Sequence, residues 1–272
     1  MVYGVFYLPI PQSEPLLKSA HHFDDSKVLT PAVRSSLMES LCTADTDLHD
    51  TCGWAISSLS ARDIGANMMR PNGATYNLNA QAMDATAVLI QGVMARGVNV
   101  REIYVDTIGQ PASYQKRLER IFPTVMITVA KKADSLYPCV SAASVCAKVT
   151  RDAALEVLYQ AWAQNGGKQN TDGGDQGKAL FWGSGYPSDA RCVAWLKQNM
   201  HPVFGWGPEC RFSWGTAKDM LETKGGVKIE WPADDDDSTS HLTDFFAASG
   251  GREKDADELG TWFGTPAGLE AF

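Results

Sequence analysis

The amino-terminal stretch of the chain is apolar on both faces of an extended backbone. Side chains alternate between the two sides of a strand, which places Val2, Gly4, Phe6 and Leu8 on one face and Tyr3, Val5 and Tyr7 on the other. A strand that is apolar on both faces is typical of the interior of a sheet. The pattern therefore predicts that residues 2–8 form a strand that needs neighbours.

Strand and helix patterns alternate after this stretch. Apolar runs predict further strands at residues 52–59, 101–106 and 124–130. Helices are predicted from Pro31, with Thr30 as N-cap, over 61–69, over 78–97, from Pro111, over 139–164, after Ser188 and over 216–224. A Gly- and Asn-rich stretch at 165–178 predicts a surface loop. The order of elements predicts an α/β fold, a mixed sheet with helices packed on its faces.

The charge of the chain is concentrated in its tail. The formal net charge is -8 over 272 residues, and residues 231–272 hold ten acidic and two basic side chains. The first 230 residues therefore hold 22 side chains of each sign and are neutral overall. A neutral body can still present a local basic groove to phosphates. The net charge thus does not exclude a nucleic-acid partner.

Cysteine and histidine patterns indicate no chemistry of their own. The six cysteines form no CxxC pair or zinc spacing, and the five histidines form no HExxH motif. The chain shows neither a secretory signal nor an apolar run of membrane-spanning length, so we expect a soluble intracellular protein with reduced thiols and no membrane partner. Carboxylates are then the groups expected to carry any catalysis.

Two aspartates follow neighbouring predicted strands. Asp106 ends the strand IYVD, and Asp134 lies just past the next strand, in KKADSLYP. An aspartate at a strand end often only caps a turn, but two strands that end at the same edge would bring both carboxylates together. Carboxylates held close repel one another unless a cation lies between them, and hard oxygen ligands suit Mg²⁺ or Mn²⁺. The pattern predicts a divalent-cation site at this edge.

Several longer motifs resemble one family. The run KKADSLYPCVSAASVCAKVTRD, with IYVDTIG before it and GSGYPSD after it, resembles the type 2 ribonuclease H family, as do DDSKVLT, YNLN and HPVFGWGPECRFSWGTAK. The last match and the preceding WLKQNM resemble the eukaryotic catalytic subunit. The resemblance implies a ribonuclease H-like mixed sheet flanked by helices over residues 1–225, including a helical C-terminal extension. Residues 226–272 are expected to form an acidic, mostly disordered tail.

The resemblance also implies an activity and its catalytic residues. Members of the family cut the RNA strand of RNA–DNA hybrids and nick duplex DNA on the 5′ side of an embedded ribonucleotide, using two divalent ions, Mg²⁺ or Mn²⁺. Asp106 and Asp134 match two of the metal-binding carboxylates. Lys27, in the Asp25-Ser26-Lys27 match, corresponds to the active-site lysine that contacts a substrate phosphate.

Other matched residues imply substrate contacts. Tyr186 in GSGYP matches the tyrosine that packs against the sugar at the ribo-to-deoxyribo junction. Further matches fall on positions that resemble phosphate or backbone contacts: Asn77, Arg211 and Thr216. Lys148 and Arg151 add positive charge on the Ser- and Ala-rich helix. For these residues, capping or core hydrogen bonds are an equally open interpretation.

The resemblance extends to partners and location. It implies the catalytic member of a nuclear heterotrimer with two accessory subunits, acting in DNA replication and ribonucleotide removal. In the tail, Leu242, Phe245 and Phe246 resemble the motif that binds the DNA sliding clamp, although Thr239 stands where that motif has Gln. Clamp binding and its absence both stay open.

One family segment has no counterpart in this sequence. Family members carry a strand ending in Asp-Glu-Ala-Gly-Arg-Gly about a dozen residues before the equivalent of Met1, and it supplies two further catalytic carboxylates. Two interpretations compete: a start site that truncates an active enzyme, or a shortened chain that assembles with partners without cutting. We expect the first, with the first strand missing from the sequence as written and little activity from the 272 residues alone.

Overall fold

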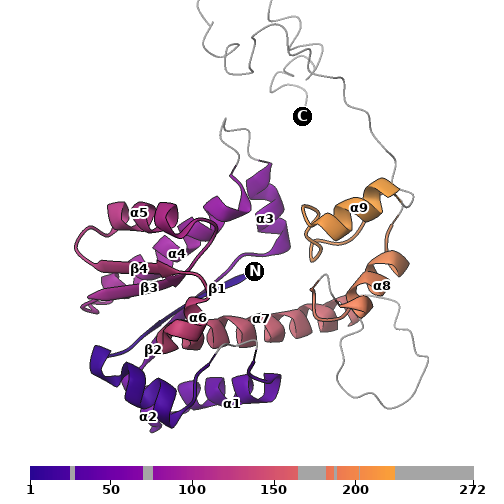
Figure 1. Cartoon of the computed structure of the whole chain (residues 1–272). Coiled ribbons are helices and arrows are strands. Elements are labelled where there is room, and N and C mark those ends of the chain that lie inside the picture. Colours follow the sequence, from indigo (N-terminus) through magenta and orange to yellow (C-terminus); the bar gives the residue numbers. More distant parts are fainter. Residues whose placement is uncertain (25–27, 70–75, 165–181, 187–188, 202, 224–272) are drawn as a thin grey trace, which may run out of the picture. The chain divides into compact units, whose positions relative to one another are not determined.

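The computed structural model describes six segments of the chain: 1–24, 28–69, 76–164, 182–186, 189–201 and 203–223. The chain divides into two units, Met1–Val227 and Lys228–Phe272. All described helices and strands belong to the first unit (Figure 1). The predicted acidic tail and the loop predicted at 165–178 lie outside the described residues.

The predicted first strand is confirmed, and its partner is the second. β1 (Val2–Tyr7) pairs antiparallel with β2 (Gly53–Ser58), so that Val2 lies opposite Ser58 and Tyr7 opposite Gly53. Four short or medium helices connect the two strands: the 3₁₀ helix η1 (Ile10–Gln12), the π-helix η2 (Ser13–Ala20), α1 (Pro31–Cys42) and α2 (Asp47–Thr51). Of these, only α1 is predicted by the sequence.

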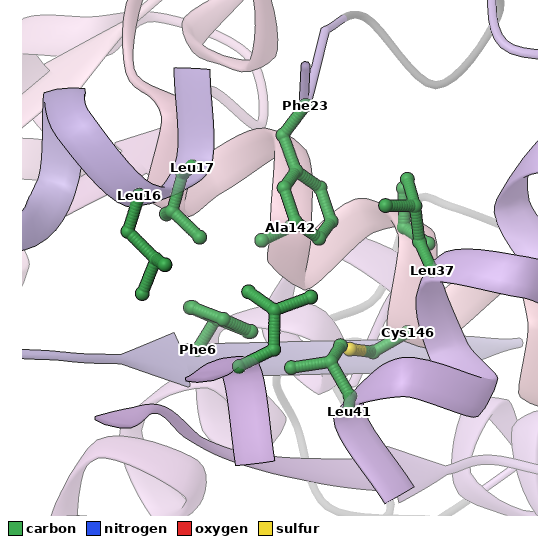
Figure 2. Packing of buried hydrophobic residues seen from close by; sticks show 10 residues of the cluster. Phe6, Leu16, Leu17, Phe23, Leu37, Leu41, Ala142 and Cys146 are labelled. Carbon is green, nitrogen blue, oxygen red and sulfur yellow. The ribbon is translucent and has the colours of Figure 1, made fainter. Parts of the chain in front are cut away.

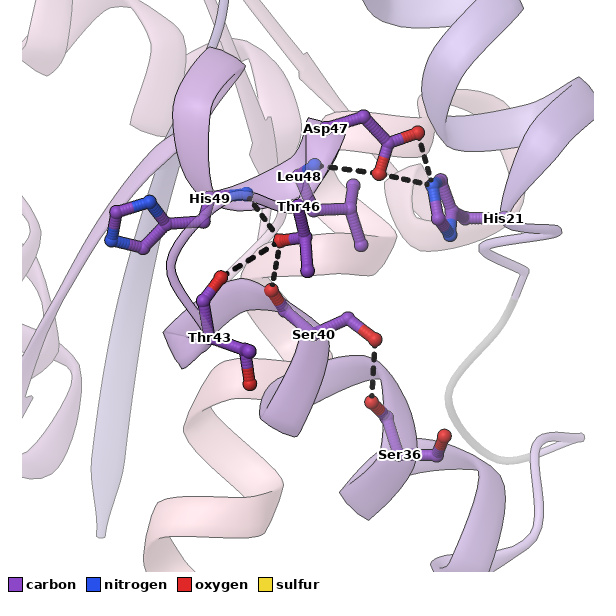
Figure 3. A network of polar contacts seen from close by, with 8 residues as sticks. All are labelled: His21, Ser36, Ser40, Thr43, Thr46, Asp47, Leu48 and His49. Carbon is purple, nitrogen blue, oxygen red and sulfur yellow. Dashed lines mark hydrogen bonds and ion pairs between the residues drawn. The ribbon is translucent and has the colours of Figure 1, made fainter.

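Side-chain caps fix the ends of these connecting helices. Thr30 Oγ1 accepts a hydrogen bond from the backbone N–H of Val33 at 3.3 Å, as its N-cap position predicts. Thr46 caps α2 by accepting from the N–H of His49 at 3.2 Å. Asp47, the first residue of α2, contacts His21 Nε2 at 2.9 Å, which lowers the pKa of Asp47 and joins the end of η2 to α2 (Figure 3).

The second strand pair is a strand–helix–strand unit. β3 (Glu102–Asp106) and β4 (Met126–Ala130) pair parallel and are joined by α5 (Pro111–Ile121). α3 (Ala61–Met68) and α4 (Leu78–Ala95) precede the unit. Its core consists of apolar residues from α4, α5 and both strands, including Met83, Ile90, Leu118, Phe122 and Ile127. The predicted order of elements is confirmed here.

Helix α7 (Pro138–Gln164) packs against the antiparallel pair (Figure 1). Its small residues permit a close approach, as the Ala- and Ser-rich sequence predicts: a Cβ built on Gly4 would lie 2.5 Å from the Ala143 carbonyl oxygen. Apolar residues from β1, η2, α1 and α7 form the core beside it, including Phe6, Leu17, Leu41, Ala142 and Cys146 (Figure 2). This packing places α7 across β1.

The C-terminal part of the first unit is helical, as expected. α8 (Ala190–Gln198) and α9 (Gly215–Thr223) bury a cluster of Cys192, Leu196, Trp206, Ala217 and Met220. Trp206 Nε1 donates a hydrogen bond to the Leu196 carbonyl at 2.7 Å. Among the described helices, none combines the length and apolarity needed to cross a bilayer.

Thiol labelling tests the packing of α7. All six cysteines are free; Cys42 is exposed, whereas burial raises the pKa of Cys146 to about 12. Because the thiolate is the reactive form, a raised pKa lowers the reactive fraction at pH 8. We expect iodoacetamide at pH 8 to label Cys42 first and Cys146 only after unfolding, as read by mass spectrometry of timed digests. Equal rates at both positions would contradict the packing.

Candidate active site

The parallel strand pair brings Asp106 and Asp134 to one edge. Asp106 ends β3 opposite Ala130, which ends β4. Lys132 then adopts a left-handed conformation with φ of 54°, and the chain turns into α6 (Ala133–Leu136), which carries Asp134. Oδ1 of Asp106 accepts a hydrogen bond at 3.1 Å from the backbone N–H of Ala133. The two strand ends are thus tied together next to both carboxylates.

Both carboxylates line one cavity of about 390 Å³. Asp106 is exposed, whereas Asp134 is 7% exposed. The walls are mainly apolar and come from β1, β3, α4 and α7. A buried carboxylate in an apolar wall is costly unless a proton, a hydrogen bond or a cation compensates its charge. Two carboxylates in the lining of one cavity are oxygen donors of the kind that bind a hard cation.

The cavity lies between two open strand edges. Met1 and Leu59 form a hydrogen-bonded pair, because each donates its backbone N–H to the carbonyl of the other. Along an antiparallel ladder, hydrogen-bonded residue pairs alternate with pairs that are not hydrogen-bonded. The backbone N–H and C=O groups of Val2, Gly4 and Phe6 therefore point away from β2. In the parallel pair, the Thr107 N–H and the Arg101 carbonyl point toward β4, where they bond to Ala130 and Met126. The backbone groups of every second residue between them, Glu102, Tyr104 and Asp106, therefore point away from β4. In the described residues the strands form two separate pairs, and the cavity lies between them.

The donors present fit a hard divalent cation in type. Aspartate oxygens are the ligands that Mg²⁺ and Mn²⁺ prefer, and Asp106 and Asp134 both contribute to the lining of this cavity. Within the part of the chain that the structure describes, no group of three His, Cys, Asp or Glu side chains is placed to hold a metal. Asp106 and Asp134 are therefore the residues here that could hold one.

Tyr186 lies on a tight turn between α7 and α8. Gly183 and Gly185 both have φ of 72°, a left-handed conformation that favours glycine. Asp189 Oδ2 accepts from the Ser184 N–H at 2.8 Å, and the Asp189 N–H donates to the Tyr186 carbonyl at 3.0 Å. The hydrogen bonds from Ser184 and Arg191 hold the pKa of Asp189 well below its usual range. The turn leaves the Tyr186 side chain 47% exposed.

Arg211 reaches the start of β1. Its Nη1 lies 3.3 Å from the sulfur of Met1. Burial raises the pKa of Tyr3, and the positive charge of Arg211 opposes that rise. Since Val2 follows this methionine and lines the cavity together with Asp106 and Asp134, the contact with the methionine sulfur places a basic group at the end of a strand that forms part of the cavity wall.

The structure describes some of the remaining predicted residues and not others. Asn77 Oδ1 accepts from the Ala80 N–H at 3.0 Å and so caps α4, which is the structural role that the sequence left open. Lys148 lies half-buried on α7, and Thr216 lies half-buried in the first turn of α9. Lys27 and the three tail residues Leu242, Phe245 and Phe246 lie outside the described residues.

The sequence indicates Arg151 only as added positive charge on its helix and does not indicate Asp189, yet both residues hold the Tyr186 turn. Arg151 on α7 donates to the Ser184 carbonyl, and its guanidinium carbon lies 4.4 Å from the centroid of the Tyr186 ring. Asp189 offers a local signal, because it stands at the start of the helix predicted after Ser188, and the structure shows it as the N-cap of α8. Arg151 offers none, since its partner lies 35 positions further along the chain.

Comparison with known proteins identifies the family. The Ribonuclease HII family profile matches residues 1–217. The chain therefore belongs to the ribonuclease HII family. A ribonuclease H2 subunit from Neurospora crassa is 65% identical over 274 residues, covering 100% of this chain and 81% of that protein. The corresponding human ribonuclease H2 subunit is 38% identical over 257 residues, covering 93% and 79%. The predicted likeness to the eukaryotic catalytic subunit is confirmed.

Solved structures of ribonuclease HII proteins share the fold. Ribonuclease H2 from Pyrococcus horikoshii OT3 superposes with a TM-score of 0.55 at 22% identity, covering 82% of this chain and 98% of that one. The ribonuclease HII of the PCNA complex from Archaeoglobus fulgidus gives the same TM-score and identity, covering 85% and 90%. The expected ribonuclease H-like fold is confirmed. The family match and the similar ribonuclease H2 subunits show that the chain is a ribonuclease H.

Proposed function

We propose that this ribonuclease HII chain cuts the RNA strand of RNA–DNA hybrids and nicks duplex DNA 5′ of single embedded ribonucleotides. The observation that carries the proposal is that Asp106 and Asp134 line one cavity, with Asp106 bonded to the residue before Asp134, in a chain that belongs to this family. Lys27 is proposed to contact a substrate phosphate, and Arg211, Thr216, Asn77 and Lys148 to contact the nucleic-acid backbone.

Asp106 and Asp134 are proposed to hold two divalent ions, Mg²⁺ or Mn²⁺. When bound, such ions supply an activated water and stabilise the charge on the leaving 3′ oxygen. The chain's own contribution is placement: the Ala133 N–H orients the Asp106 carboxylate, and burial keeps water away from Asp134. Mg²⁺ takes six oxygen ligands, so two aspartates need further donors from substrate, water or additional protein groups.

The cavity between the open edges of β1 and β3 suggests where additional protein groups enter. A strand lying there would pair with both edges, and its end beside Asp106 would place oxygen ligands at the cation site. The missing first strand of the family fold stays a prediction, and this cavity is where we propose that it belongs. Without it we expect the 272-residue chain alone to cut slowly.

The rival function is a binding chain that assembles with partners without cutting. A hybrid-cleavage assay in Mg²⁺ separates the two, using the natively assembled enzyme and the isolated 272-residue chain. We expect cleavage by the native enzyme and little by the isolated chain. Absence of cleavage by the native enzyme would support the rival, and robust cleavage by the isolated chain, abolished by Asp106→Asn, would show that two aspartates suffice.

Tyr186 is proposed to read the ribose at the cleavage junction. An aromatic stack is worth about 1–3 kcal/mol, so we expect Tyr186→Ala to lower the preference for a duplex with one ribonucleotide over an all-DNA duplex by about tenfold or more. Tyr186→Phe keeps the ring and most of the preference. Competition binding with the two duplexes measures it, and an unchanged preference in Tyr186→Ala would contradict this role.

The partners and location are proposed from the relatives. The Neurospora and human relatives are each named as one subunit of ribonuclease H2, and such a name denotes a multisubunit enzyme. This supports assembly of the present chain with two accessory subunits. The Archaeoglobus enzyme was solved with PCNA, which supports a clamp contact through Leu242, Phe245 and Phe246. A protein that removes ribonucleotides during replication and repair would act in the nucleus, which we propose as its location.

A further inference from the structure

Arg151 contacts the Tyr186 turn at two points. The guanidinium carbon lies 4.4 Å from the centroid of the Tyr186 ring, and Nη2 donates a hydrogen bond to the carbonyl oxygen of Ser184. A planar guanidinium can stack on a ring and donate at its edge at the same time, which an ammonium group cannot. One side chain therefore fixes the backbone of the turn and one face of the ring.

The guanidinium has a further hydrogen-bond partner in the adjacent residue of its own helix, Asp152. Its Nη1 donates to Oδ1 of Asp152 at 2.8 Å, and the other oxygen of Asp152 lies 3.9 Å from Arg34 on α1. The Arg151 side chain is 22% exposed. Gly185 adopts φ of 72°, and a Cβ built there would lie 3.0 Å from Nη2 of Arg151. The turn and the arginine are thus closely fitted to one another.

From these contacts we propose that Arg151 is a positioning residue for ribose recognition. It covers one face of the Tyr186 ring and directs the exposed remainder toward the sugar. The proposal deepens, and rests on, the proposed role of Tyr186. Without the guanidinium the ring can occupy other rotamers, so the ribose contact is made in only a fraction of molecules and the preference for ribonucleotides falls.

Binding measurements on the natively assembled enzyme test this role. Affinity for a duplex with one ribonucleotide and for an all-DNA duplex is compared with Ca²⁺ in place of Mg²⁺, so that cleavage does not interfere. We expect Arg151→Lys, which keeps the charge but loses the planar stack, to reduce the preference about three- to tenfold. In a Tyr186→Ala background the same substitution is expected to reduce it no further.

The matched control is Arg34→Lys. Arg34 faces the same Asp152 carboxylate but belongs to α1, so this substitution should leave the preference unchanged. A preference unchanged in Arg151→Lys would overturn the proposal. So would an additional loss in the Tyr186→Ala background, because Arg151 would then act independently of the ring.

A second measurement separates this proposal from the function on which it rests. In the chain labelled with 3-fluorotyrosine, the ¹⁹F signal of Tyr186 is assigned by its loss in Tyr186→Phe. We expect Arg151→Lys to shift or broaden that signal and Arg34→Lys to leave it in place. If the unsubstituted enzyme shows no ribonucleotide preference, the proposed function fails, while the ¹⁹F result still decides whether Arg151 holds Tyr186. An unmoved signal would overturn the positioning role.

Discussion

Asp106→Asn is expected to lower the rate of hybrid cleavage by the native enzyme on the order of 10³-fold or more. A metal site contributes several kcal/mol of transition-state stabilisation, and about 1.4 kcal/mol corresponds to a factor of ten in rate. Asn keeps the oxygen that accepts the 3.1 Å hydrogen bond from the Ala133 N–H but loses the negative charge. The unfolding midpoint should therefore change little, so that the loss reports on chemistry.

The measurement is the single-turnover rate in Mg²⁺ on an end-labelled RNA–DNA hybrid. Asp134→Asn should behave similarly, because its carboxylate lines the same cavity. Asp50→Asn is the matched control, since the side chain of this exposed aspartate contacts His49 and, in the described contacts, no other residue. A variant Asp106→Asn that kept more than about a tenth of the rate, while folded, would contradict a metal-binding role.

Gly4→Ala is expected to destabilise the fold by about 1–3 kcal/mol. The added Cβ would lie 2.5 Å from the Ala143 carbonyl oxygen, a backbone atom that can move only with α7. Urea unfolding followed by circular dichroism measures the change in the free energy of unfolding. Since α7 also carries Arg151, the same substitution should weaken the hold on the Tyr186 turn.

Gly92→Ala is the matched control for this prediction. Gly92 lies within α4, and a Cβ built there meets no atom within 4 Å. Replacing a helical glycine with alanine at an open position stabilises by about 0.5–1 kcal/mol. The two Gly→Ala substitutions should therefore shift the urea midpoint in opposite directions. A Gly4→Ala protein as stable as the unsubstituted one would show that α7 does not approach β1 as closely as described.

Much of the fold could be predicted because its signals are local. The Thr30–Pro31 start of α1 and the alternation of β3 and β4 depend on neighbouring residues, and both are observed. The π-helix η2 and the short α6 were missed. A π-helix has no distinctive sequence period, and four residues are too few to show one.

Parts of the candidate site, too, could be predicted only where the signal is local in the sequence. The sequence could predict that Asp106 and Asp134 lie near one another, because each follows one of two neighbouring strands that end at the same edge. The structure places both residues at that edge. The Arg151–Tyr186 contact could not, because it depends on how α7 packs relative to a turn 35 positions away. Such long-range contacts follow from packing rather than from any local spacing.

Binding of Mn²⁺ tests the central claim, that Asp106 and Asp134 act together to hold the divalent cations. The free Mn²⁺ signal in electron paramagnetic resonance is titrated with the 272-residue chain, with Asp106→Asn, with Asp134→Asn and with the double variant. We expect the unsubstituted chain to bind Mn²⁺, each single variant to lose that binding, and the double variant to lose no more. Binding by both single variants that equals that of the unsubstituted chain would contradict the account.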